Sequence, residues 1–330
     1  MIENITYGEM TELPGVEMIP AKIGQPHFPA HAFRIKSGKL IVHSAWAIPV
    51  VDNKTCFQAF TDVHVSKSEF LLNTDLNATT PIRDALMLSY MPSYYHFLIY
   101  RLPALAYLDD AEQDGSINVI TISRLLDRMI SPVDGLTLEL ANNRRMVRVQ
   151  ASPGVYNVEN LIVPQIRNPW FGAYFNRTVM LPFLLKKSGL ANTIEAMSDM
   201  KLFVRRRADT RRLANEPEIE AWHLRRGYVP VDPGALEMHE QAALFARATH
   251  IVGAEGAAMT NLVFAPRTKF AAILANPTTA TDTFFTDLLS RFGVEAKIVT
   301  GQFVDENDRA RTADFTVSLD QIVALHAGVP

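Results

Sequence analysis

Residues 251–261 (IVGAEGAAMTN) place small side chains where one apolar segment passes into the next. Small residues allow a ligand to approach the backbone closely, and the free N–H groups at the start of a helix attract anions. A diphosphate is therefore a candidate ligand of this segment. The alternative is that glycine and alanine only allow a strand and a helix to pack tightly, because the full G-x-G-x-x-G spacing is absent.

A run of arginines ends another apolar segment, with Arg205, Arg206 and Arg207 in sequence and Arg211 and Arg212 shortly after. The planar guanidinium group suits phosphate because it donates two hydrogen bonds at once. Charge runs are usually solvated surface. Ligands bind beyond the carboxyl ends of parallel strands, however, and we expect at least one of these arginines to bind one.

Three further places in the chain carry titratable side chains that could take part in chemistry. His96, near the predicted start of a helix, is a candidate general base or a structural histidine at a helix cap. Glu240 either accepts hydrogen bonds from a sugar or ribose hydroxyl, or is an acidic residue favoured in a first helical turn. Asp109-Asp110 lacks the Asp-x-Asp spacing of a metal site, and we predict no metal and no cofactor.

The C-terminal half alternates between strand and helix patterns. Predicted strands cover residues 201–205, 228–231, 250–253 and 270–274, and predicted helices cover residues 217–226, 238–246, 257–264 and 281–292. Such an alternation predicts parallel strands with helical crossovers, which form a doubly wound sheet.

The N-terminal half is less regular. Predicted strands cover residues 39–43, 47–51, 56–65, 118–122 and 161–163, with another near Val147, and predicted helices cover residues 81–88, 93–106, 123–130 and 171–187. Pro103 should kink or end the second of these helices, because proline lacks an N–H donor. The proline-rich segment 163–169 predicts a boundary between a domain of residues 1–165 and one of residues 166–330.

Composition excludes several classes of protein. The 330 residues suit two domains, and 48% hydrophobic and 20% charged residues are typical of globular proteins. A net charge of −3 argues against a nucleic-acid partner. The single cysteine, Cys56, cannot form an intrachain disulfide, and neither a signal peptide nor a transmembrane segment is recognisable. We therefore expect a cytoplasmic protein, with peripheral association as its only contact with a membrane.

In their order along the chain, these segments resemble glycosyltransferase family 61. The similarity covers residues 90–275 and rests on Tyr94-Tyr95-His96 with Leu102-Pro103, Val204-Arg205-Arg206, Arg211-Arg212, Asn215-Glu216, Gly227-Tyr228, Glu240-Gln241, and 253–261 followed by Phe264. The chain departs from the family pattern at three places. Arg205 stands where serine is common, Glu255 replaces a histidine, and Tyr100 replaces an acidic residue.

The resemblance implies an α/β protein of the GT-B type, with two Rossmann-like domains and a cleft between them. Residues 1–165 would bind the acceptor and residues 166–330 the nucleotide-sugar donor. The implied activity is an inverting, metal-independent transfer of a sugar to a glycan or lipid-linked acceptor. Bacterial members take part in the synthesis of capsular and other surface polysaccharides.

The resemblance also implies roles for individual residues. Arg206 and one of Arg211 and Arg212 would hold the donor phosphates, and the turn Gly256, Ala257, Ala258, Thr260 and Asn261 would face the same group. His96 would lie across the cleft as the catalytic base, with Glu255 as the alternative base. Two other functions remain open at this point: a non-catalytic sugar- or nucleotide-binding protein, and a nucleotide-sugar epimerase or hydrolase.

Overall fold

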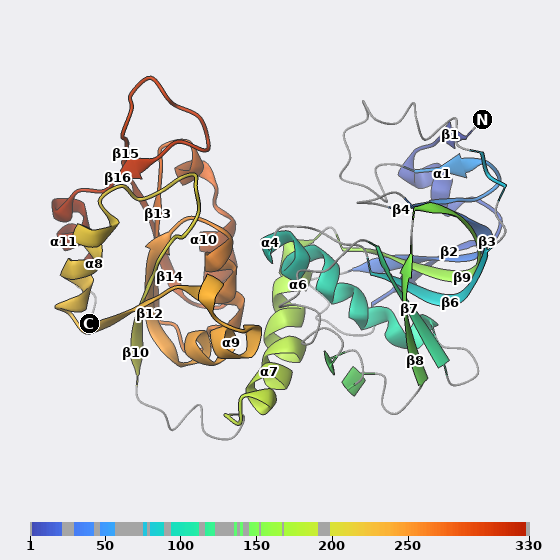
Figure 1. The fold of residues 1–330 in the computed structure, drawn as a ribbon, viewed down its shortest axis with the longest axis horizontal. Helices are drawn as coiled ribbons and strands as arrows, with labels where there is room; N and C mark the ends of the chain where they lie inside the picture. The colour runs from blue at the N-terminus through green and yellow to red at the C-terminus, as the bar shows by residue number, and fades with distance from the viewer. Residues whose placement is uncertain are drawn as a thin grey trace. The chain divides into compact units, whose positions relative to one another are not determined.

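The computed structural model is a mixed α/β structure with two compact units, Met1–Phe175 and Asn176–Pro330 (Figure 1). It describes residues 2–21, 30–42, 47–56, 75–77, 80–88, 94–111, 116–122, 135–136, 139–140, 145–151, 153–166, 168–190 and 199–327. Each unit has its own sheet.

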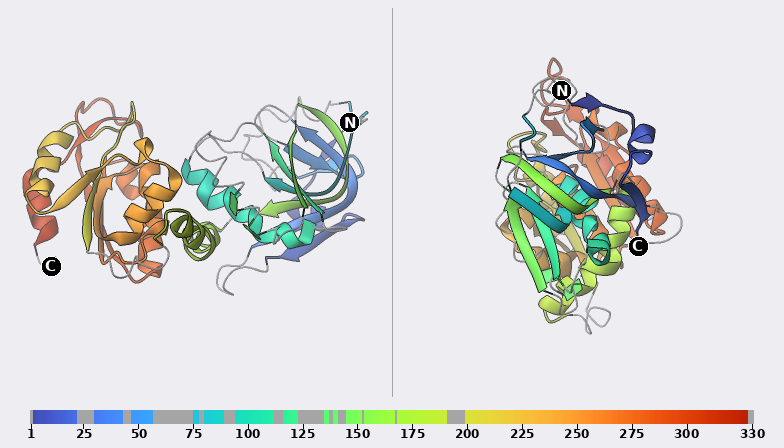
Figure 2. Two further views of the ribbon diagram at one scale, coloured as in Figure 1. Left: turned by 60° about the horizontal axis from the view of Figure 1, so that its bottom comes forward. Right: turned by 90° about the vertical axis from the view of Figure 1, so that its right-hand side faces the viewer.

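A mixed seven-stranded sheet forms the N-terminal unit (Figure 2). Its strands are β2 (Val16–Pro20), β3 (His31–Val42), β4 (Ala47–Val50), β6 (Thr80–Leu88), β7 (Ser116–Ile122), β8 (Arg145–Ala151) and β9 (Gly154–Gln165). The order is β2-β3-β9-β6-β7-β8, with β4 paired to β3. Strands β2, β4 and β9 run antiparallel to β3, whereas β6, β7, β8 and β9 form parallel pairs. Strands β1 (Glu3–Asn4) and β5 (Lys54–Thr55) pair separately, and helix α1 (Tyr7–Thr11) precedes β2.

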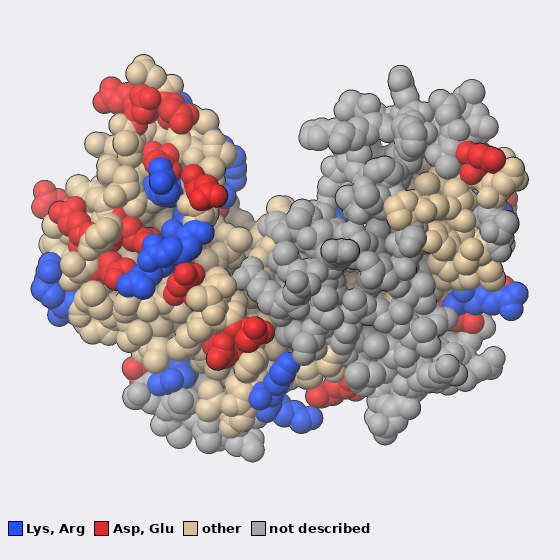
Figure 3. Space-filling model, viewed as in Figure 1, with Lys and Arg blue, Asp and Glu red and all other residues tan. Residues whose placement is uncertain are grey.

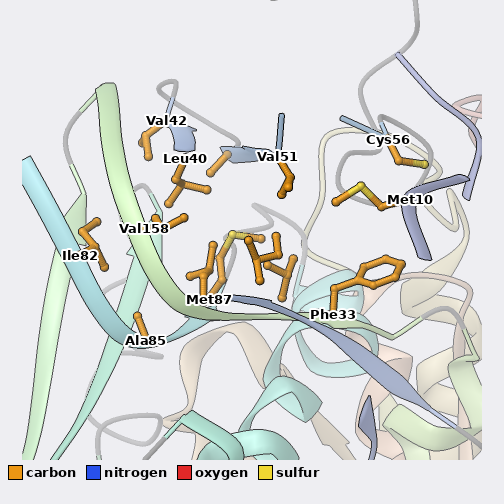
Figure 4. Packing of buried hydrophobic residues seen from close by; sticks show 14 of the residues in the cluster. Met10, Phe33, Leu40, Val42, Val51, Cys56, Ile82, Ala85, Met87 and Val158 are labelled. Atoms are coloured by element: carbon orange, nitrogen blue, oxygen red, sulfur yellow. The ribbon is translucent and has the colours of Figure 1, made fainter. Parts of the chain in front are cut away.

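The core of this unit lies between the sheet and its N-terminal segments (Figure 4). Phe33 and Leu40 of β3 and Met87 of β6 extend into it together with Met10 of α1, and all four are buried. Cys56 is buried in the same core.

The predicted helix over residues 81–88 is wrong, because this segment is the central strand β6. Strand β6 lies between β9 and β7, and its residues Ala85, Leu86, Met87 and Leu88 are all buried. A central parallel strand covered on both faces carries a continuous apolar run without strict alternation. Apolar side chains at Ile82, Ala85 and Leu86 therefore also match helical spacing.

The predicted helix over residues 93–106 changes type along its length. It consists of α4 (Tyr94–His96), the π-helical turn η2 (Phe97–Arg101) and the 3₁₀ helix η3 (Leu102–Ala111). The 3₁₀ geometry begins at Leu102, one residue before Pro103, which has no N–H to donate. The predicted helix 123–130 and nearly all of the predicted strand 56–65 lie outside the described residues.

The predicted helix over residues 171–187 is present as three consecutive helical segments. These are α6 (Pro169–Phe175), the π-helical turn η4 (Asn176–Met180) and α7 (Leu181–Lys187). The boundary between the two units therefore falls inside this helical segment.

The C-terminal unit contains the predicted parallel sheet. Its strands are β10 (Met200–Val204), β11 (Tyr228–Val231), β12 (Ala248–Ala254), β13 (Phe270–Ala275) and β14 (Glu295–Thr300), in the order β11-β10-β12-β13-β14. All four pairings are parallel. Because β10 lies between β11 and β12, the winding of the sheet reverses beside it, which makes β10 and β12 the topological switch point.

Helices cover both faces of this sheet (Figure 1). Helices α8 (Glu216–Leu224) and α11 (Leu319–His326) lie on one face, and α9 (Met238–Arg247) and α10 (Phe284–Arg291) lie on the other. The predicted helix over residues 257–264 is the 3₁₀ helix η7 (Ala257–Phe264). The predicted strand–helix alternation is thus confirmed.

Two histidines join α8 to α11. His223 is fully buried, with Nδ1 2.8 Å from the carbonyl oxygen of Ile219 and Nε2 3.3 Å from Nε2 of His326. A carbonyl only accepts hydrogen bonds, so the His223 proton is on Nδ1, and His326 donates to Nε2 of His223. Burial lowers the pKa of each histidine to about 4, and for His326 the neighbouring His223 adds to the effect.

We expect the stability of the C-terminal unit to fall as the pH drops from about 6.5 to about 4. The folded pKa values lie below the unfolded value of 6.5, so the unfolded chain binds more protons in this window. The loss should reach roughly 3 kcal/mol for each histidine. Urea titrations at several pH values, followed by tryptophan fluorescence, measure it.

The variant His326→Phe should flatten this pH dependence, whereas His239→Gln on α9 should leave it unchanged. An identical slope in wild type and His326→Phe would contradict the prediction.

Candidate functional site

The carboxyl ends of β10 and β12 bring the arginine run and the small-residue segment together. The last paired residues of the two strands are Val204 and Gly253, so residues 205–207 and 254–256 leave the sheet side by side. Gly253 fits here because an added Cβ would lie 2.7 Å from Cβ of Val204 and 2.9 Å from its carbonyl oxygen. The interpretation of tight packing therefore holds at Gly253.

Arg206 crosses from the first of these segments to the second. Its Nη1 donates to the carbonyl oxygen of Glu255 (3.1 Å) and its Nε to that of Thr210 (3.0 Å), while its backbone N–H donates to Oε2 of Glu216 (3.0 Å). The two side-chain contacts use two of about five guanidinium donors, so others remain for a ligand. Burial lowers the pKa of Arg206, and the nearby charge of Arg211 lowers it further.

Gly256 leaves room for this guanidinium. A Cβ at Gly256 would lie 1.8 Å from Nη1 of Arg206. The open space that the sequence assigned to a ligand is thus occupied by the protein's own arginine. Gly256 therefore leaves the space that the guanidinium of Arg206 fills.

We expect Gly256→Ala to weaken anion binding about tenfold with little change in melting temperature, because the new methyl group displaces the end of a flexible side chain. The φ of Gly256 is 162°, an extended conformation that alanine adopts without strain. Isothermal titration with nucleoside diphosphates measures the affinity.

Gly253→Ala is the matched comparison, since its methyl group meets Val204 rather than Arg206. It should lower stability by roughly 1–3 kcal/mol. Unchanged affinity in Gly256→Ala would contradict the role assigned to this glycine.

Glu255 pairs with Arg211. Nη1 of Arg211 contacts Oε2 of Glu255, and the Glu255 side chain is only 14% exposed. The backbone of Arg211 has a φ of +56°, and its N–H donates to the carbonyl oxygen of Thr312 (2.9 Å). The carboxylate that replaces the family's histidine therefore compensates one of the arginines.

Arg212 pairs with Asp314 instead. Its Nε and Nη2 lie 2.9 and 2.7 Å from Oδ2, and its backbone N–H lies 2.7 Å from Oδ1. These bonds hold the pKa of Asp314 below its usual value. Of the two arginines that the resemblance left open, Arg211 joins Arg206 and Glu255.

The two remaining arginines of the run also pair with carboxylates. Arg205 binds Glu220 through Nε (2.7 Å) and Nη2, and Nη1 of Arg207 lies 2.6 Å from Oε1 of Glu216. In the described part of the chain, Arg206 is thus the one arginine among the five whose guanidinium contacts only carbonyl oxygens. Figure 3 shows basic and acidic side chains close together on this unit.

Glu216 is a site residue that reasoning from the residues missed. It begins α8, and its two carboxylate oxygens accept from the Arg206 backbone and from the Arg207 side chain. The signal was its place in the Asn215-Glu216 pair, which the family resemblance includes.

The residues after Gly256 become increasingly buried along η7. Ala257 is exposed and Ala258 half-buried, whereas Thr260 and Asn261 are fully buried. Nδ2 of Asn261 donates to Oε1 of Gln241 (2.8 Å), which ties η7 to α9.

Glu240 completes the N-terminal cap of α9. Its Oε2 accepts from the backbone N–H of Glu237 at 2.8 Å. These contacts favour the structural interpretation of Glu240, as an acidic residue in the first turn of a helix.

His96 belongs to the N-terminal unit, in the segment that follows the carboxyl end of β6. Its side chain is exposed, its ring stacks on Tyr100 at 6.1 Å, and its ring centroid lies 4.9 Å from that of Tyr95. Close packing holds the segment in place, because a Cβ at Gly172 of α6 would lie 1.8 Å from the carbonyl oxygen of Ile99.

Among the described residues, no group of three or more His, Cys, Asp or Glu side chains could hold a metal ion. No helix in that part of the chain is long and apolar enough to cross a membrane.

Comparison with known protein families gives a match over the central part of the chain. The model of the family "Glycosyltransferase 61" matches residues 94–271, which is more than half of the chain. The matched region begins two residues before His96 and includes all five arginines and Gly256. No curated protein matches the chain.

Proposed function

Because the chain belongs to glycosyltransferase family 61 and is a glycosyltransferase, we propose that it binds a nucleotide-sugar donor at the carboxyl ends of β10 and β12. The observation that carries the proposal is the arrangement of Arg206, which crosses Gly256 with no carboxylate on its guanidinium in the described part of the chain. A partly buried guanidinium that contacts carbonyl oxygens but no carboxylate favours an anionic ligand. The diphosphate of a nucleotide-sugar is such a ligand, and the switch point of a parallel sheet is its usual location.

In this proposal, ion pairs with carboxylates reduce the positive charge of the arginine run, residues 205–212, at the donor site. Arg205, Arg207 and Arg212 each form an ion pair with a carboxylate, from Glu220, Glu216 and Asp314 respectively. Arg211 pairs with Glu255, beside the proposed position of the diphosphate. Arg206 supplies the main charge, and Arg211 supplies the second donor group. Turn residues Ala257 and Ala258 lie next to this position, whereas Asn261 and Glu240 would act by holding η7 and α9. Thr260 is buried within η7.

The proposed reaction is a single displacement that inverts the configuration of the transferred sugar. A base removes the proton of the acceptor hydroxyl, while Arg206 and Arg211 stabilise the negative charge of the departing nucleoside diphosphate. Positioning and leaving-group stabilisation supply most of the catalysis, and no metal takes part. We assign the base to His96, with Glu255 as the alternative.

The family supports the remaining features of the proposal. These are a GT-B arrangement, with the acceptor bound by the N-terminal domain, and a glycan or lipid-linked acceptor in surface polysaccharide synthesis. We also propose a cytoplasmic location with peripheral membrane association.

A thermal-shift screen with nucleoside diphosphates and nucleotide-sugars tests the proposal, because a ligand that binds the folded state raises its stability by mass action. A shift with one nucleotide class, followed by acceptor-dependent sugar transfer, is the expected result. Turnover of the donor without any acceptor would indicate an epimerase or hydrolase instead. Binding without turnover would indicate a non-catalytic protein, and no shift with any ligand would refute the donor site.

A further inference from the structure

A hairpin near the C-terminus is bonded to both sides of the candidate donor site. It lies between the short strands β15 (Gln302–Phe303) and β16 (Phe315–Thr316), which pair antiparallel. The carbonyl oxygen of Thr312 accepts from the backbone N–H of Arg211 (2.9 Å). Nδ2 of Asn276 donates to the carbonyl oxygens of Arg311 (3.3 Å) and Ala313 (3.0 Å).

These contacts place residues 311–313 over the carboxyl end of β12. Arg211 belongs to the loop that leaves β10, and Asn276 directly follows β13. Strand β12 lies between β10 and β13 in the sheet. A segment bonded to both flanking loops therefore crosses the end of β12, where Glu255 and Gly256 lie.

Arg311 presents a cation at this crossing. Its Nη1 lies 3.2 Å from Oδ1 of Asp282, and Nη2 contacts Oδ2. The hydrogen bonds to Asp282 raise the pKa of Arg311, and the charge of Glu255 contributes to the increase. Glu255 is thus close enough to act on Arg311 electrostatically, whereas the ion pair of Arg311 in the described residues is with Asp282.

The ion pair between Arg311 and Asp282 can be broken at little cost in free energy. The Arg311 side chain is 56% exposed and that of Asp282 36% exposed. Exposed ion pairs contribute about 0–1 kcal/mol. The backbone of the segment is held by buried Asn276, so the guanidinium can change partner without movement of the segment.

We propose that Arg311 is a further donor-binding residue. When the donor binds, the guanidinium of Arg311 releases Asp282 and contacts the diphosphate of the nucleotide-sugar from the side opposite Arg206. This assignment rests on the proposed function, because it takes the ligand to be a nucleoside diphosphate. Asp282 holds Arg311 over the site in the free protein. Arg311 is a binding residue here and carries no proton in the reaction.

Isothermal titration of the full chain with UDP, GDP, CDP, dTDP and ADP tests the assignment. Arg311→Gln should weaken the best ligand roughly tenfold, the size expected for a charge-assisted hydrogen bond at a partly exposed site. Asp282→Asn removes the competing carboxylate and should strengthen binding about two- to fivefold. Arg309→Gln is the matched control, since Arg309 lies in the same hairpin and its Nε contacts only the carbonyl oxygen of Glu306 in the described structure.

The outcomes separate this inference from the function on which it rests. If the wild type binds a nucleoside diphosphate and Arg311→Gln binds it equally well, Arg311 has no role and the donor site stands. If Arg309→Gln weakens binding as much as Arg311→Gln, the effect is only one of general charge, and the inference is wrong. If the wild type binds none of the five nucleotides, the proposed donor site itself fails.

Discussion

Replacement of His96 by glutamine should lower kcat roughly 100- to 10,000-fold, the range expected when a general base is removed. The affinity for the donor nucleotide should stay unchanged, because His96 lies in the N-terminal unit and the arginines lie in the C-terminal unit. His96 is an exposed side chain whose ring packs on Tyr95 and Tyr100, so glutamine should not unfold the segment. Initial rates at saturating donor and acceptor, together with titration of the nucleoside diphosphate, separate kcat from binding.

The competing assignment predicts a different pattern. If Glu255 is the base, Glu255→Gln abolishes turnover and His96→Gln retains it. If Glu255 only compensates Arg211, Glu255→Gln leaves kcat nearly unchanged and tightens diphosphate binding, because a carboxylate beside the ligand has been removed. His239→Gln controls for the loss of a histidine elsewhere.

The C-terminal sheet could be predicted because its signals are local. Each strand from β10 to β13 is a short apolar run, and each is followed by a helix pattern, which dictates parallel strands and crossovers. Strand β14 was missed because five of the six residues in Glu295–Thr300 are exposed or only partly buried, and three of the six are polar or charged. The helix predicted over residues 81–88 failed for the opposite reason, since the buried end of this central strand, Ala85–Leu88, is continuously apolar and carries no alternation.

The position of the arginine run could also be predicted, but the carboxylate partner of each arginine could not. The end of a parallel strand indicates where Arg206 must lie. Which arginine remains uncompensated depends on carboxylates at residues 216, 220, 255 and 314, which approach only in the folded sheet. The Arg211–Glu255 pair spans 44 residues of sequence and the Arg212–Asp314 pair spans 102. No local pattern carries that information.

Gly256 illustrates the same limit at a single residue. Its sequence context indicated that another group lies close to the backbone of Gly256, and in the structure one does. The approaching group is Arg206 from a different loop rather than a ligand. A glycine in such a turn indicates that space is needed, and only the fold determines what fills it.

The variant Arg206→Gln should weaken nucleoside diphosphate binding about 10- to 100-fold, because a charge-assisted hydrogen bond is worth roughly 1.5–3 kcal/mol. Glutamine lacks the charge and cannot reach both the carbonyl oxygen of Glu255 and the ligand. If Arg206 also stabilises the leaving group, kcat/KM should fall further than the affinity for the product nucleotide. Titration calorimetry and steady-state kinetics on one preparation give the two quantities.

Arg205→Gln is the matched control, since Arg205 precedes Arg206 in the chain but is paired with Glu220. It removes the same formal charge from the same loop, so equal losses in the two variants would indicate a general electrostatic effect and refute a specific contact. A loss confined to Arg206→Gln would mean that position and not charge alone makes the site. In that case the carboxylates of Glu216, Glu220 and Asp314 have a defined role, because they compensate the three arginines of the run that lie outside the proposed donor contact.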